Sequence, residues 1–188
     1  MAILMRRQEM KEIKVWDLFI RLFHWSMVTI ILINFTLFDE GTVHEILGYI
    51  LLGLLALRFI WGFVGSEHAR FKDFMPSPAK IKQYLNDMKM GKMPSFIGHN
   101  PLGAVMIFNL YITLLLLSLT GYMAITDRFW GEEWVEEIHE FFANYLLFSV
   151  ALHVAGIIWV SVKSKVNLIS AMFTGIKKFP SDNLDYHG

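Results

Sequence analysis

The sequence contains no cysteine and has fewer charged residues than a typical soluble domain. Without cysteine, the chain has no disulfide, no cysteine-ligated zinc or iron–sulfur site and no covalently attached c-type haem. Charged residues make up 18% of the chain, and Lys plus Arg equal Asp plus Glu at 17 each; an average soluble protein is about 25% charged. This composition argues against a disordered chain and against a nucleic-acid-binding protein that depends on net positive charge.

The apolar residues, 55% of the chain, are collected in four long runs. The runs cover about residues 18–38, 44–64, 102–125 and 138–162. A helix rises about 1.5 Å per residue, so about 20 apolar residues cross the ~30 Å hydrocarbon core of a bilayer. Buried helices of a water-soluble bundle would show a polar stripe at helical spacing, and the residues around Leu114–Leu117 show none. The sequence therefore predicts an all-α membrane protein, a bundle of four transmembrane helices.

Basic residues gather on one side of the predicted membrane. Residues 1–17, the 65–101 loop and the 163–188 tail together carry fourteen Lys and Arg, whereas the two short loops on the other side carry one, Arg128. Cytoplasmic loops are usually the basic ones. We therefore expect a multi-pass membrane protein with a cytoplasmic N-terminal segment (1–17), a four-helix domain (18–162) and a cytoplasmic tail (163–188). The first run lacks the cleavage site of a signal peptide and is expected to remain as a helix.

The loops carry two further patterns. Within the 65–101 loop, residues 79–88 form a predicted amphipathic surface helix that ends before Gly91, and Asn100-Pro101 is typical of a helix start. The two short loops on the opposite side are rich in acids. These acids are Asp39, Glu40, Asp127, Glu132, Glu133, Glu136 and Glu137.

Four of the seven histidines lie in or at the edge of the apolar runs: His24, His44, His139 and His153. Ionisable residues within a bilayer are costly and are usually functional. Because successive helices run in opposite directions, His24 is expected in the cytoplasmic half, and His44 and His139 near the opposite face. His153 follows His139 by 14 residues, which is about 21 Å deeper and on the same helix face. Depth therefore pairs His44 with His139 and His24 with His153.

Two imidazoles at each of two depths suit haem better than a bare metal ion. A zinc site needs three or four protein ligands, and a di-iron carboxylate site needs Glu-x-x-His motifs that are absent. A haem brings four nitrogens and takes two axial ligands from the protein. We therefore predict two non-covalent b haems, with both axial positions filled, as in electron transfer. The alternative is a haem-free membrane protein whose buried histidines carry protons.

Two arginines are candidate partners for the haem propionates in the cytoplasmic half. Arg58 follows His44 by 14 residues and shares its helix face, and Arg21 lies one turn before His24. A guanidinium matches a carboxylate, although both side chains could instead reach lipid head groups. A quinone site is not located by spacing alone. Its candidates are His99, Asn100 and Arg21 on the cytoplasmic side and Glu140 and Asn144 on the other.

The candidate residues lie in short motifs that follow one another along residues 13–178. These motifs are RLFHW at 21–25, HEILG at 44–48, RFIWG at 58–62, GHNPLG at 98–103, IHE at 138–140, AN at 143–144, LH at 152–153 and NLISAMFTG at 167–175. In this order they resemble the bacterial cytochrome b561 superfamily, which includes the b-type subunit of Ni/Fe hydrogenases. The resemblance implies two b haems held by histidines of the first, second and fourth helices.

The resemblance also implies a location in the bacterial inner membrane and electron exchange between the quinone pool and a periplasmic partner. In the hydrogenase branch, electrons run from a periplasmic enzyme to quinone; in other branches, quinol supplies a periplasmic c-type cytochrome. The compact chain favours a c-type cytochrome over a hydrogenase as partner, and the acidic loops suit a basic protein. A quinol:oxygen or quinol:superoxide oxidoreductase without a protein partner is a further alternative, so the sequence leaves the enzyme class open.

Overall fold

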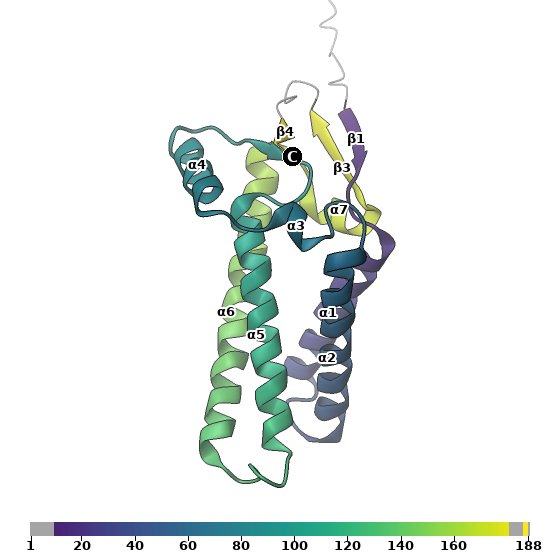
Figure 1. The fold of residues 1–188 in the computed structure, drawn as a ribbon, viewed down its shortest axis with the longest axis vertical. Coiled ribbons are helices and arrows are strands. Elements are labelled where there is room, and N and C mark those ends of the chain that lie inside the picture. The colour runs from purple at the N-terminus through teal and green to yellow at the C-terminus, as the bar shows by residue number, and fades with distance from the viewer. Residues whose placement is uncertain (1–9, 181–185, 188) are drawn as a thin grey trace, which may run out of the picture.

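The computed structural model describes residues 10–180 and 186–187. Four long helices run side by side along its long axis (Figure 1): α1 (Leu18–Thr36), α2 (Gly41–Val64), α5 (Pro101–Ala124) and α6 (Glu133–Ser164). Helices α1 and α2 form one pair, α5 and α6 form a more closely packed pair, and α2 contacts α5. The predicted helical architecture is therefore confirmed.

Each long helix is long and apolar enough to cross a membrane. Only 11–22% of the most apolar stretch of each helix is buried inside the protein, so most of its large apolar side chains face outwards. A continuous apolar surface of this size is rare on a soluble monomer and is the surface that lipid covers. The chain is thus a multi-pass membrane protein.

Helix α6 is longer than its apolar run. It begins at Glu133, before the start at 138 that the apolar run predicts, and its first turn contains Glu133 and Glu136. Negative side chains stabilise the positive N-terminal end of a helix. Glu133, Glu136 and Glu137, which were expected in a loop, are therefore helical.

Four short strands lie at one end of the bundle, which we call the sheet end (Figure 1). β1 (Met10–Lys14) pairs antiparallel with β3 (Ile176–Pro180), and β2 (Ser95–Phe96) pairs in parallel with β4 (Tyr186–His187). The expectation of an all-α chain did not include these strands. They form because the segments on either side of the bundle meet at the same end and satisfy each other's backbone groups.

Three short helices complete the sheet end: α3 (Phe71–Phe74), α4 (Pro78–Lys89) and α7 (Leu168–Thr174). Helix α4 confirms the predicted surface helix, and Asn100 caps α5 as predicted, because its side-chain oxygen accepts from the N–H of Gly103 at 2.7 Å. The opposite end, which we call the loop end, contains only the connections 37–40 and 125–132.

Gly175 allows the chain to turn from α7 into β3. Its φ is +82°, and a Cβ at this position would lie 2.6 Å from the carbonyl oxygen of Trp16. Only glycine fits this backbone conformation and this close approach. The carbonyl of Gly175 accepts from the N–H groups of Val15 and Trp16 at 2.8 and 3.1 Å. This turn therefore joins the segment that follows α7 to the segment just before the start of α1.

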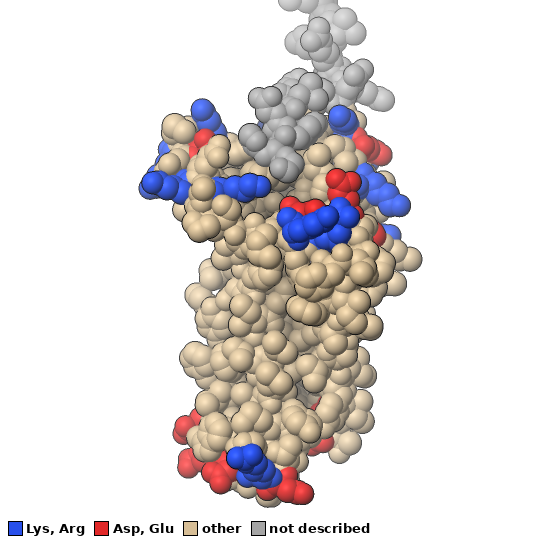
Figure 2. All heavy atoms as spheres, viewed as in Figure 1, with Lys and Arg blue, Asp and Glu red and all other residues tan. Residues whose placement is uncertain are grey.

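Charged side chains gather at the two ends of the bundle, and its middle is largely uncharged (Figure 2). Twelve of the fourteen basic residues assigned to one side lie in the segments at the sheet end, and the other two, Arg6 and Arg7, lie outside the described residues. The loop end is mainly acidic and has one basic residue, Arg128.

Candidate functional site

The structure brings the four candidate histidines together in two couples. His44 of α2 faces His139 of α6, with ring centres 6.1 Å apart and ring planes at 75°. His24 of α1 and His153 of α6 lie close enough to interact electrostatically. All four side chains are half-buried. Helix α6 therefore contributes to both couples, while α5 contains no histidine.

An apolar layer separates the two couples. Leu146, which is fully buried, lies seven residues from both His139 and His153 on α6. It packs in a cluster to which all four long helices contribute. The other buried members are Met27, Ile30, Leu51, Leu55 and Leu114. The two histidine couples therefore lie at different depths on either side of an apolar core.

The geometry of His44 and His139 fits two axial ligands of one iron. An imidazole nitrogen binds a metal at about 2 Å and lies about 1 Å from its ring centre, so two axial rings have centres about 6 Å apart. The observed 6.1 Å agrees with this value. Beside Gly48 and Gly156, an added Cβ would meet no heavy atom within 4 Å, so neither glycine is packed closely against another helix. Among the described residues, no group of three or more His, Cys, Asp or Glu could hold a bare metal ion.

The second ring nitrogens of the loop-end couple have hydrogen-bond partners. Nδ1 of His44 lies 3.0 Å from the carbonyl oxygen of Phe38, which can only accept, so this nitrogen carries the proton. Nδ1 of His139 lies 3.0 Å from the hydroxyl of Thr120 on α5. Gly121 lies beside the same ring, because an added Cβ there would come within 2.9 Å of Cε1 of His139. Sequence reasoning missed Thr120 and Gly121, although a Thr-Gly pair at the depth of His139 in an apolar run was an available signal.

Arg58 is buried near the sheet-end couple. Only 3% of the residue is exposed, its Nη2 donates to the carbonyl oxygen of Ala69 at 2.9 Å, and its guanidinium lies over the rings of Phe71 and Tyr111. Within the described part of the chain, Nη1 is buried without a hydrogen-bond partner. A buried guanidinium with one free nitrogen suits a carboxylate, which is the chemistry of a haem propionate.

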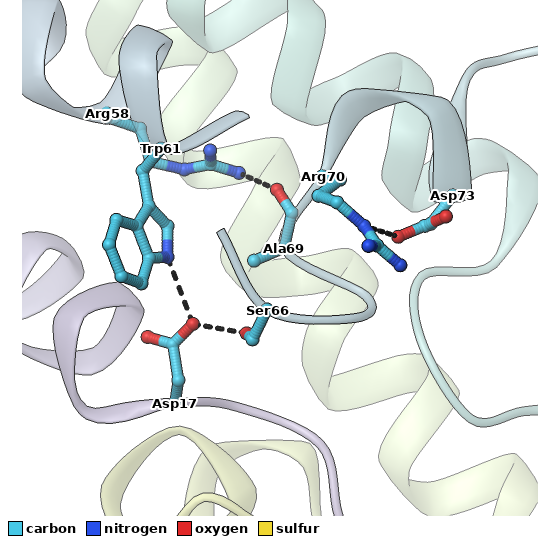
Figure 3. Close-up of polar contacts among 7 residues, drawn as sticks. All are labelled: Asp17, Arg58, Trp61, Ser66, Ala69, Arg70 and Asp73. Atoms are coloured by element: carbon cyan, nitrogen blue, oxygen red, sulfur yellow. Dashed lines mark hydrogen bonds and ion pairs between the residues drawn. The ribbon is translucent and has the colours of Figure 1, made fainter. Parts of the chain in front are cut away.

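Asp17 joins α1 to the end of α2 beside Arg58 (Figure 3). Its carboxylate accepts from Nε1 of Trp61 at 3.0 Å, from the hydroxyl of Ser66 and from the N–H of Ile20 at 2.8 Å. Burial raises the pKa of Asp17, but these hydrogen bonds and the charge of Arg58 outweigh it and hold the pKa below its ordinary value. Asp17 is therefore a carboxylate at neutral pH and fixes the entry of the first helix.

Arg21 lies at the sheet end but is engaged with the backbone. Its Nη1 donates to the carbonyl oxygen of Phe173 at 2.6 Å, and its Nε lies 3.4 Å from the carbonyl oxygen of Asp17. Helix α7 ends one residue later. Arg21 thus connects α1 to α7. To bind a propionate as well, it would have to use N–H groups that these two hydrogen bonds leave free.

His99 lies between two aromatic rings at the sheet end. Its ring centre is 4.6 Å from that of Trp16 and 4.7 Å from that of Phe74. Burial, with smaller contributions from the charges of Lys177 and Arg58, lowers the pKa of His99 well below its ordinary value. Its Nδ1 has no hydrogen-bond partner among the residues that the structure describes. His99 is therefore a neutral ring with an unused polar atom.

The other quinone candidates differ in their availability. The side chain of Asn100 is used as the cap of α5, although its remaining atoms stay half-buried beside His99. Glu140 and Asn144 are exposed on α6. The structure thus brings the sheet-end candidates into one region and leaves the loop-end ones on the outer surface of the bundle.

Comparison with known proteins supports the resemblance. A family model described as prokaryotic cytochrome b561 matches residues 15–175. A protein of Azotobacter vinelandii named "Probable Ni/Fe-hydrogenase B-type cytochrome subunit" is 27% identical over 168 residues, covering 76% of this chain and 70% of the relative. A protein of Rhizobium leguminosarum bv. viciae with the same name is 23% identical over 217 aligned positions, covering 91% of each. No solved structure matches the chain. Because the family model spans most of its length, the chain belongs to the prokaryotic cytochrome b561 family and is a membrane b-type cytochrome.

Proposed function

We propose that this cytochrome holds two b haems and carries electrons across the membrane between a quinone and a soluble redox partner. One haem would bind between His44 and His139 near the loop end, and one between His24 and His153 near the sheet end. The observation that carries this proposal is that α6 supplies one histidine to each of two couples, 14 residues apart and on one face.

Haem b, when bound, supplies a one-electron Fe(III)/Fe(II) couple. The residues of the chain hold and insulate it. Two histidines at each depth leave no open coordination position, which favours electron transfer over oxygen binding. The cluster around Leu146 keeps water out between the two depths. Arg58, and Arg21 with its remaining donors, would hold propionates at the sheet end.

We place the quinone at the sheet end. His99 offers an unused ring nitrogen between Trp16 and Phe74, and a flat ring with polar oxygens can both stack on aromatic side chains and accept or donate a hydrogen bond. The basic residues of this end support a cytoplasmic location, because cytoplasmic segments of membrane proteins are usually basic. Both termini would then be cytoplasmic, and the loop end periplasmic.

We infer that the soluble partner binds at the acidic loop end. Both relatives described above carry a hydrogenase subunit name, which favours a hydrogenase over a c-type cytochrome. The expectation of a c-type cytochrome depended on chain length alone, whereas the names of the relatives point to a hydrogenase. Opposite charge speeds the encounter of two proteins and makes it sensitive to salt.

The first experiment measures haem and quinol reactivity in purified protein. We expect two haems per chain, a reduced-minus-oxidised absorbance band, and reduction of the haem by a menaquinol analogue under anaerobic conditions. Absence of the band would contradict the proposal and support the haem-free alternative. Steady oxygen consumption with quinol and no protein partner would instead support the oxidoreductase alternative.

The second experiment tests the docking face with candidate partners of both kinds. Changing Glu132, Glu133, Glu136 and Glu137 to Gln should slow electron exchange with a basic partner by about tenfold at low salt and little at high salt. A matched control changes Glu67 to Gln and Asp87 to Asn, acids of the sheet end. Equal rates for wild type and the loop-end variant at low salt would exclude docking there. Exchange with a hydrogenase and not with a c-type cytochrome would settle the partner class.

A further inference from the structure

Helix α5 supplies no candidate iron ligand, yet it contacts His139 at two points. The hydroxyl oxygen of Thr120 lies 3.0 Å from Nδ1 of His139. At Gly121, an added Cβ would lie 2.9 Å from Cε1 of the same ring and 3.3 Å from its Nδ1. The last turns of α5 therefore form a surface against which the ring packs, which we call the seat. Thr120 supplies a hydroxyl there, and Gly121 has no side chain.

The direction of the hydrogen bond follows from the other contacts of Thr120. Its Oγ1 lies 2.9 and 3.0 Å from the carbonyl oxygens of Leu116 and Leu117. Carbonyl oxygens can only accept, so the single hydroxyl proton of Thr120 is donated to them. Oγ1 is then left to accept from His139, and Nδ1 of His139 carries the proton. The other ring nitrogen, Nε2, is left with a free lone pair.

His44 reaches the same state through a different acceptor, the carbonyl oxygen of Phe38. Both rings of the loop-end couple therefore present an unprotonated Nε2, which is the form that binds a metal. The difference between them is chemical. The acceptor of His44 is backbone and cannot be removed by substitution, whereas His139 has, besides the backbone of Leu117, a side-chain acceptor in Thr120.

We propose that Thr120 is a positioning residue that holds His139 as the Nδ1–H tautomer and thereby tunes the iron bound between His44 and His139. The proposal rests on the proposed function, because it assumes haem at this couple. A hydrogen bond accepted from Nδ1–H makes the ring a stronger electron donor. Stronger donation stabilises Fe(III) relative to Fe(II) and lowers the reduction potential of this site.

The test compares three variants by redox titration of the haem spectrum. Thr120→Val keeps the shape of the side chain and removes the hydroxyl, and Thr120→Ser keeps the hydroxyl. Thr113→Val is the matched control, because Thr113 also donates to a carbonyl four residues earlier on α5, that of Asn109 at 2.8 Å, and is one of two such buried threonines of this helix.

We expect Thr120→Val to raise the potential of one haem and leave the other unchanged. Loss of a residue behind a metal ligand typically changes metal binding by at least about tenfold, and a tenfold change in the ratio of Fe(III) to Fe(II) binding is about 59 mV for one electron. Thr120→Ser and Thr113→Val should titrate as wild type does. The electron paramagnetic resonance signal of the affected haem should change in Thr120→Val alone.

Two further outcomes also decide the proposal. If Thr120→Val loses one haem and Thr120→Ser retains both, the hydroxyl is needed to hold the ligand, which supports positioning. If Thr120→Val shows wild-type potentials and signals with two haems bound, Thr120 has no such role and the inference is overturned. The proposed function fails separately, if wild-type protein binds no haem.

Gly121→Ala provides a second variant that does not alter the hydroxyl. Because the added methyl would lie 2.9 Å from Cε1 of His139, the ring must shift, and we expect loss of one haem or a change in its signal. An unchanged spectrum and potential in Gly121→Ala would show that the ring moves freely, which would also contradict a seat formed by α5.

Discussion

The His44–His139 couple and the His24–His153 couple differ in the partners of their second ring nitrogens. At the loop end, Nδ1 of His44 and Nδ1 of His139 each lie 3.0 Å from a hydrogen-bond acceptor. At the sheet end, Nδ1 of His24 is buried and has no partner in the described parts of the chain. The two proposed haem sites would therefore have histidine ligands of different donor strength.

The charges around the two couples also favour a higher reduction potential at the sheet end than at the loop end. The sheet-end couple lies near the buried guanidinium of Arg58, since His99 interacts with both Arg58 and His153. The loop end is acidic. Positive charge favours the reduced iron and negative charge the oxidised iron. We therefore expect the sheet-end haem to have the higher potential, so that electrons move downhill from the loop end to the sheet end.

The largest expected effect separates the couples by removing one ligand at a time. His139→Ala should lower the haem content from two per chain to one and leave the sheet-end haem, because its ligands lie on the other side of the Leu146 cluster. His153→Ala should leave the loop-end haem instead. The haem-to-protein ratio and the potential of the remaining haem report both results.

The control for these variants is His68→Asn, which changes a loop histidine with a positive φ that asparagine tolerates. It should retain two haems. Loss of both haems from His139→Ala, with helix content unchanged by circular dichroism, would show that the couples are not independent.

The second prediction tests the difference in potential through Arg58. At an effective dielectric constant of about 20, one charge about 8–15 Å away contributes about 1–2 kcal/mol, which is roughly 40–90 mV for one electron. Arg58→Met should lower the sheet-end potential by that amount and leave the loop-end potential unchanged. Arg58→Lys, which keeps the charge, should change it less. Equal shifts of both haems in a redox titration would refute a local effect of Arg58.

The helices and the depths of the four histidines could be predicted from the sequence, because they depend on local periodicity. The apolar runs predict the four helices, and the 14-residue spacing from His139 to His153 predicts which histidines share a depth. Pro78 and Gly91 predict the limits of α4. All of these follow from helix geometry and from backbone preferences that need no knowledge of distant contacts.

The remainder depends on contacts between distant segments. Residues 10–14 and residues 176–180 pair as strands. Neither segment has a sequence pattern that predicts this pairing, because each is short and lies outside the apolar runs. The hydroxyl of Thr120 donates to a carbonyl of its own helix, as a threonine in any apolar helix can. The sequence therefore does not indicate that Thr120 also contacts His139. Arg21 was expected near a propionate by its spacing from His24, yet it also reaches the carbonyl of Phe173, 152 residues away.

The third prediction concerns a buried lysine at the sheet end that has no counterpart among the described residues of the loop end. Lys177, 4% exposed, donates to the carbonyl oxygens of Phe96 and Gly98 at 3.2 and 2.6 Å. Burial lowers the pKa of Lys177 from 10.5 to about 7. Between these values the unfolded chain binds more protons than the folded one, so stability should rise as the pH rises.

Thermal unfolding of the purified protein from about pH 7 to about pH 9.5 measures this slope. Tyr84, whose pKa burial raises above 10.0, stays protonated in this range. Relative to Lys177→Met, wild type should gain at least about 2–4 °C as the pH rises. Lys178→Met, which changes the exposed partner of Glu12, is the control and should retain the slope. Parallel curves for wild type and Lys177→Met would contradict a depressed pKa.

The smallest expected effect lies between the couples, where three polar side chains join α5 to α6. Nδ2 of Asn109 donates to the hydroxyl of Ser149 at 3.0 Å, and the hydroxyl of Tyr145 donates to Oδ1 of Asn109 at 2.8 Å. Hydrogen bonds between membrane helices contribute about 0.6 kcal/mol each on average. Asn109→Leu should therefore lower the free energy of unfolding by roughly 1 kcal/mol, and Ser149→Ala by about half as much.

Because these bonds lie between the two depths, Asn109→Leu should leave both reduction potentials where they are while the protein unfolds at a lower temperature. Redox titration and thermal unfolding of the same preparation separate the two readouts. A shift of the loop-end potential alone would mean that α5 transmits strain to Thr120. A shift of the sheet-end potential alone would place the three side chains in the environment of His153. Either result would show that the reduction potentials of the two haem sites are coupled and not set independently.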